Sequence, residues 1–121
     1  MQRIYVRTAL TVEQEVRNMV SDAALKARIA AECYRHAAYP PDYVEVATVE
    51  AAILPPEWQG RIDAVSAIDR MALDPASPVE YADGTGQSAI WLERGPRGQV
   101  NARVKDWIER HDPSELPFGL Q

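Results

Sequence analysis

The sequence has one cysteine in 121 residues, so no disulfide can form within the chain. A single thiol is typical of proteins in a reducing compartment. No uncharged apolar run approaches the ~18 residues of a membrane-spanning helix. Arg7 interrupts the apolar run at the N-terminus, and no cleavage site of small residues follows it, as it would in a secretory signal peptide. We therefore expect a cytoplasmic protein with no membrane segment.

Patterns for metal binding and nucleophilic catalysis are scarce as well. Cys33 and His36 lie three residues apart in a predicted helix, but a structural zinc site normally needs four ligands, and the only other histidine is His111. A Cys–His nucleophilic pair would also need oxyanion donors. The interior of a helix does not offer them, because its amides are already bonded. We expect no metal and no cofactor.

Asp69 is the candidate for a catalytic carboxylate. If its helix begins near Trp58, apolar side chains surround Asp69, and a raised pKa would suit a general acid or base. If the helix begins after Gly60, Asp69 falls at the rim of the apolar face. Gly60 favours the later start, because glycine is unfavourable inside a helix. A small enzyme that uses this carboxylate is our third hypothesis for the function, after the two that are given at the end of this section.

The negative charge is concentrated in the middle of the chain. The net charge is −5 overall, and residues 41–90 carry nine Asp/Glu against two Arg. Phosphate neutralisation needs clustered cations, so we expect no generic nucleic-acid binding. An acidic segment can instead meet a basic surface of a partner protein, or can simply be solvated and keep the protein soluble.

A stretch of 28 residues without Pro or Gly, Thr11 to Ala38, predicts a long helix that stops at Pro40-Pro41. Thr11 and Gln14 have the spacing of a capping box. Apolar residues recur at helical spacing on one face: Val12, Val16, Met19, Val20, Ala23, Ala27, Ala30, Tyr34 and Ala37. A straight helix of this length spans about 42 Å, which exceeds the diameter of a compact domain of 121 residues. It therefore breaks, with Ser21-Asp22 as the favoured place, or its end contacts another molecule.

The second half of this helix carries apolar residues on another side too, because Leu25, Ile29 and Cys33 repeat every four residues. A helix that is apolar on most sides is buried. We predict an interface with a second copy of the chain that includes these three residues and His36. Packing inside the chain is the alternative.

The remaining pattern predicts an α+β fold with the element order β-α-β-α-β-β-α. The expected strands are 3–10, 43–49 with a continuation toward 54, 79–82 and 88–93. The expected helices after the first are 60–73 and 100–111. Asp83-Gly84-Thr85-Gly86 is a hairpin signal between the last two strands. We expect one domain over residues 1–112, with a sheet that is mixed or antiparallel, and a flexible tail over residues 113–121.

A run of arginines and glycines leads into the last predicted helix. Helix N-termini present free N–H groups to anions, and arginine can bind phosphate or carboxylate with two bonds. An ordinary turn with solvated arginines is the alternative. The residues predicted to bind an anion are Arg94, Arg97, Gly98, Asn101 and Arg103.

Two functions from different classes follow. The first is a small non-catalytic protein, such as an inhibitor, an immunity-type protein or an accessory subunit. It would bind another protein through acidic residues that include Glu45, Glu50 and Glu57. The second is a protein that binds a small anionic ligand, such as a nucleotide, at the arginine-flanked helix start.

Overall fold

The computed structural model describes residues 22–54, 56 and 63–111, and within them four helices accompany three strands. In chain order these are α2 (Asp22–Arg35), β1 (Val44–Glu45), α3 (Val46–Ile53), α4 (Ala64–Ala72), β2 (Val79–Tyr81), β3 (Ala89–Leu92) and α5 (Arg97–His111). The fold is α+β, as predicted. The predicted strand at 3–10, the first half of the predicted long helix and the tail at 113–121 lie outside the described residues.

The three strands form an antiparallel sheet in the order β1-β3-β2. The hairpin predicted from the Asp83–Gly86 turn is confirmed, with Val79 paired to Leu92 and Tyr81 to Ile90. Gly84 and Gly86 have φ angles of 75° and 61°. Such left-handed conformations favour glycine, so the turn chemistry fixes where the chain reverses.

The predicted strand at 43–49 is wrong beyond its first residues. Only Val44–Glu45 pairs with β3, and from Val46 to Ile53 the chain is helical. Val49 and Ile53 lie four residues apart on this helix, and both are buried. The helix packs on α2 and α4. Burial of this face outweighs the β-propensity of the valines, which is weak and depends on context.

The described part of the first helix ends at Arg35, three residues before the predicted end. The amide of Ala37 donates to the Tyr34 carbonyl and that of Ala38 to the Cys33 carbonyl, both at 3.0 Å. These two bonds, with a φ of 50° at Ala37, form a Schellman motif. The motif stops the helix before Pro40-Pro41 is reached.

The two later helices match the predicted ones closely. α4 begins after Asp63, whose Oδ1 accepts from the Ser66 amide at 2.9 Å, so the predicted start at residue 60 is corrected to 64. α5 begins at Arg97 rather than at residue 100 and ends at His111, as predicted. The residues predicted for its apolar face are all buried: Val100, Val104, Trp107 and Ile108.

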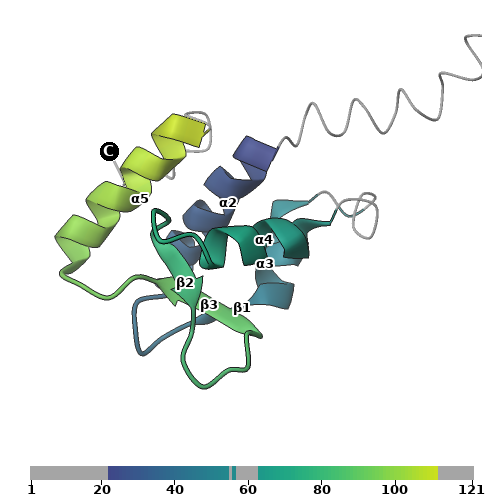
Figure 1. Cartoon of the computed structure of the whole chain (residues 1–121), viewed down its shortest axis with the longest axis horizontal. Coiled ribbons are helices and arrows are strands. Elements are labelled where there is room, and N and C mark those ends of the chain that lie inside the picture. The colour runs from purple at the N-terminus through teal and green to yellow at the C-terminus, as the bar shows by residue number, and fades with distance from the viewer. Residues whose placement is uncertain (1–21, 55, 57–62, 112–121) are drawn as a thin grey trace, which may run out of the picture.

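Helix α2 lies at the centre of the described structure. It packs against α5 along one side, against α3 and α4 on another, and against β3 (Figure 1). Leu25, Ile29 and Cys33 are buried in the core of the chain. Their predicted place at an interface between copies is corrected, because packing inside the chain covers both apolar sides of α2. None of the helices in the described ranges is long and apolar enough to cross a membrane.

Candidate functional site

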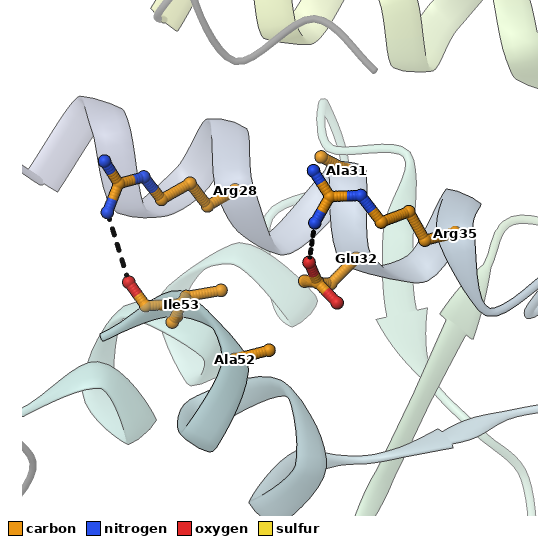
Figure 2. A pocket seen from close by; sticks show the side chains of 6 residues that line it. All are labelled: Arg28, Ala31, Glu32, Arg35, Ala52 and Ile53. Atoms are coloured by element: carbon orange, nitrogen blue, oxygen red, sulfur yellow. Dashed lines mark hydrogen bonds and ion pairs between the residues drawn. The ribbon is translucent and has the colours of Figure 1, made fainter. Parts of the chain in front are cut away.

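A surface pocket of about 200 Å³ lies between α2 and α3 and is called here the α2–α3 pocket. Arg28, Glu32 and Arg35 are four and three residues apart, a spacing that puts them on one face of α2. Ala31 of the same helix completes this wall, and Ala52 and Ile53, the last two residues of α3, form the other. Figure 2 shows both arginine side chains extending along α2, with Arg28 reaching the Ile53 carbonyl and Arg35 reaching Glu32.

The charged groups of the α2–α3 pocket are held in place by one another and by the backbone. Glu32 is only 6% exposed, and its carboxylate accepts from Nη1 of Arg35. The Nε2 atom of His36 lies 3.6 Å from the other carboxylate oxygen. Nη1 of Arg28 donates to the Ile53 carbonyl at 3.2 Å, at the C-terminus of α3, where a cation is favourable. The pocket therefore holds two guanidinium groups and one carboxylate in defined positions.

A second pocket, of about 190 Å³, lies where α4 leads into β2. We call it the acidic pocket, because its lining includes the carboxylates of Asp74, Glu80 and Glu93. The remaining lining residues are Ala72, Leu73, Pro75, Ser77 and Val79. Leu73 is 62% exposed, the highest value among the large hydrophobic side chains in the described ranges. The pocket thus combines negative charge with exposed apolar surface.

The carboxylates of the acidic pocket have partners within the chain. Glu80 accepts from Nε1 of Trp91 at 3.0 Å, and Asp74 accepts from the Ala76 amide at 2.9 Å. Glu93 forms an ion pair with Arg103. In the described part of the chain, one cation thus stands against three carboxylates, which leaves the pocket with an excess of negative charge.

The arginines predicted to bind an anion divide into two groups. Arg94 pairs with Asp83 at 2.6 Å and lies 5.0 Å from the centre of the Trp91 ring. Arg103 pairs with Glu93 and also donates to the Ala76 carbonyl at 2.8 Å. These two cations face carboxylates of the hairpin, and their charges are offset there.

The other predicted residues of that segment gather around Tyr39. The Arg97 guanidinium lies 4.4 Å from the centre of the Tyr39 ring, and the Tyr39 hydroxyl donates to Asn101 at 2.5 Å. Gly98 is exposed in the first turn of α5, with open space where a Cβ would stand. Of the five residues predicted to bind an anion, three lie together at the start of α5: Arg97, Gly98 and Asn101. The other two, Arg94 and Arg103, pair with carboxylates of the hairpin instead.

The remaining predicted site residues are dispersed. Cys33 is fully buried and its thiol pKa is raised by burial and then by the nearby Glu32 charge, whereas His36 is exposed. Glu45 is exposed at the sheet edge and Glu50 is half-buried on α3. Glu57 lies outside the described residues. Among the described residues, no group of three or more His, Cys, Asp or Glu side chains is arranged to hold a metal ion.

Asp69 is half-buried and accepts from the Tyr81 hydroxyl at 2.5 Å. Burial, with this bond to Asp69, raises the pKa of Tyr81 to about 12. Because α4 begins at Ala64, its buried residues include Ile68 and Met71, and Asp69 lies at the rim of that face, as expected for the later helix start. The Tyr81–Asp69 bond links β2 to α4.

Sequence reasoning did not identify either pocket. The spacing of Arg28, Glu32 and Arg35 was a signal for the first, because it predicts one charged helix face. No comparable signal existed for the second, since Asp74, Glu80 and Glu93 are brought together only when the hairpin folds against the end of α4. No protein-family model, curated protein or solved structure matches this chain.

Proposed function

We propose that this chain is a non-catalytic protein that binds another protein, and that the acidic pocket receives a basic side chain of that partner. The observation that carries the proposal is the combination in one pocket of three carboxylates and the exposed side chain of Leu73. Interfaces commonly combine a buried apolar anchor with charges that orient the partner. An arginine side chain fits both features, because its guanidinium can pair with a carboxylate while its methylene stem covers apolar surface.

The charge of the surrounding chain supports a basic partner. Within the described ranges, the cation between residues 41 and 90 is Arg70, and it pairs with Asp22 of α2 at 2.6 Å. Among the described residues, no ion pair joins Arg70 to an acidic residue of its own segment. A field of one sign speeds encounter with an oppositely charged surface and weakens as salt is added.

The proposal can be tested with a defined basic peptide. We expect an acetylated, amidated Gly-Arg-Gly-Arg-Gly peptide to shift the backbone NMR signals of Leu73, Asp74 and Glu80 saturably, and the matching Gly-Glu-Gly-Glu-Gly peptide to leave them unchanged. Asp74→Asn combined with Glu80→Gln removes two charges. If each exposed pair contributes about 0.2–1 kcal/mol, the affinity should fall roughly two- to thirty-fold.

Glu109→Gln is the matched control, because Glu109 is exposed on α5 and outside the pocket. It should leave the affinity near that of the unmodified protein. Shifts spread evenly over all acidic residues, or equal weakening by the control, would show that the peptide senses net charge and that the pocket is not a docking site.

A further inference from the structure

A guanidinium group of this chain already lies at the rim of the acidic pocket. Arg103, on α5, donates through Nη1 to both carboxylate oxygens of Glu93 and through Nη2 to the Ala76 carbonyl at 2.8 Å. Glu93 lines the pocket, and Ala76 lies between the lining residues Pro75 and Ser77. The fold thus shows directly that this rim accepts an arginine side chain.

The three carboxylates of the pocket differ in what they accept hydrogen bonds from. Asp74 accepts from the Ala76 amide and Glu80 from the Trp91 indole, which are neutral donors and leave each carboxylate its charge. Glu93 is paired with a cation instead. Within the described ranges, Glu93 is therefore the pocket carboxylate whose charge an ion pair offsets.

The pairing of Arg103 with Glu93 is exchangeable. The Arg103 side chain is 47% exposed, whereas that of Glu93 is 17% exposed. An ion pair with one partner in solvent contributes little net stability, because water solvates the released cation. A second guanidinium has the same planar fork and can form the same paired bonds with the carboxylate. Displacement of Arg103 by an incoming arginine is thus an exchange of like for like.

We propose that Arg103 is an internal competitor, which occupies Glu93 until a basic side chain of the partner displaces it. This inference rests on the proposed function, because it concerns how the same pocket is controlled. While Arg103 holds Glu93, the partner meets the charges of Asp74 and Glu80. Once Arg103 swings into solvent, the partner meets a third carboxylate. Arg103 therefore lowers the affinity of the resting pocket.

Removal of Arg103 should strengthen binding of the Gly-Arg-Gly-Arg-Gly peptide. In NMR titrations we expect Arg103→Ala to bind it roughly two- to fivefold more tightly than the unmodified protein, the range of one exposed ion pair. Arg103→Met, which keeps an apolar stem on α5, should give the same gain, and it carries the test if Arg103→Ala lowers the melting temperature.

Arg110→Ala is the matched control. It removes another exposed arginine of α5 and breaks the ion pair of that arginine with Asp106, so it changes the net charge by the same amount outside the pocket. It should leave the affinity unchanged. A second control combines Arg103→Ala with Glu93→Gln. The gain should disappear when Arg103→Ala is compared with the unmodified residue in the Glu93→Gln background, because no carboxylate is left to be released.

The outcomes separate this inference from the proposed function. Tighter binding confined to the two Arg103 variants, and absent in the Glu93→Gln background, supports the competitor. If the peptide binds the unmodified protein but the Arg103 variants bind no more tightly, the competitor is refuted and the protein-binding function stands. An equal gain in Arg110→Ala, or a gain that persists with Glu93→Gln, refutes the competitor too, because net charge then explains it. Absence of binding by the unmodified protein and by both Arg103 variants overturns the proposed function, and the competitor with it.

Discussion

At the residue scale, the described interior is apolar except for two side chains, Glu32 and Ser77. Glu32 is paired with Arg35, and the Ser77 hydroxyl accepts from the Val79 amide at 3.0 Å. Among the described residues, no buried side-chain nitrogen or oxygen lacks a partner. A polar group left unpaired in the interior would cost about 1–3 kcal/mol, so these bonds account for the tolerance of a carboxylate at this depth.

Cys33 lies next to Glu32 and should be chemically inert in the folded protein. It is fully buried, and its thiol pKa is raised first by burial and then by the Glu32 charge, so almost no thiolate forms at pH 8. The thiolate is the reactive species. We expect labelling by Ellman's reagent to be far slower under native conditions than in guanidinium chloride.

A variant with a surface thiol provides the control for this experiment. Ala47 is exposed on α3, so Ala47→Cys in a Cys33→Ser background should react at once under native conditions. Rapid native labelling of the unmodified protein, at a rate near that of the control, would show that Cys33 is accessible and would contradict its place in the core.

At the element scale, the sequence predicted the elements whose signals are local. The Asp83–Gly86 turn fixed the hairpin, and the four-residue spacing of Val100 and Val104 fixed the face of α5. α3 was missed because Val46 and Val49 favour a strand when they are read without neighbours. The packing of α3 against α2 and α4 favours the helix. The local sequence pattern of residues 46–53 does not reveal these contacts with distant parts of the chain.

The end of α2 offers a test at this scale. Ala37 adopts a φ of 50° in the Schellman motif, a conformation that costs a residue with a Cβ about 1–2 kcal/mol. Glycine avoids this cost but loses about 0.5–1 kcal/mol of chain entropy on folding. We therefore expect Ala37→Gly to raise the free energy of unfolding by about 0.5–1 kcal/mol, measured by urea denaturation.

The same substitution inside a helix should have the opposite sign. Ala102 is exposed within α5, and Ala102→Gly should lower the free energy of unfolding by about 1 kcal/mol. If Ala37→Gly also destabilises the protein by a similar amount, Ala37 is not in the left-handed conformation and the helix continues past it.

At the scale of the whole molecule, the candidate sites depend on contacts that join distant parts of the chain. The sequence identified the arginines near α5, but the hairpin carboxylates direct Arg94 and Arg103 away from a common site. The α2–α3 pocket forms only where the end of α3 meets α2. Contacts between residues that are far apart in the sequence leave no periodic pattern in it. The two apolar sides of α2 had two explanations for the same reason, since a helix face alone does not say which surface covers it.

Ile29 decides between those explanations. It is fully buried at the centre of α2, among residues of the same chain. Removing the side chain of a core isoleucine leaves a cavity, so we expect Ile29→Ala to lower the free energy of unfolding by about 2–5 kcal/mol. Because Ile29 faces the interior of its own chain, light scattering should give the same molar mass for the variant and for the unmodified protein.

Val65→Ala on α4 is the matched control for Ile29→Ala. Val65 is exposed, so this loss of apolar volume should change the free energy of unfolding by less than about 0.5 kcal/mol. Urea denaturation at two protein concentrations separates the cases, because the stability of an obligate dimer depends on concentration and that of a monomeric fold does not. A concentration-dependent midpoint that Ile29→Ala abolishes, together with a halved molar mass, would place Ile29 at a contact between two copies. An unchanged mass with a large loss of stability at both concentrations is the result that the burial of Ile29 within its own chain requires.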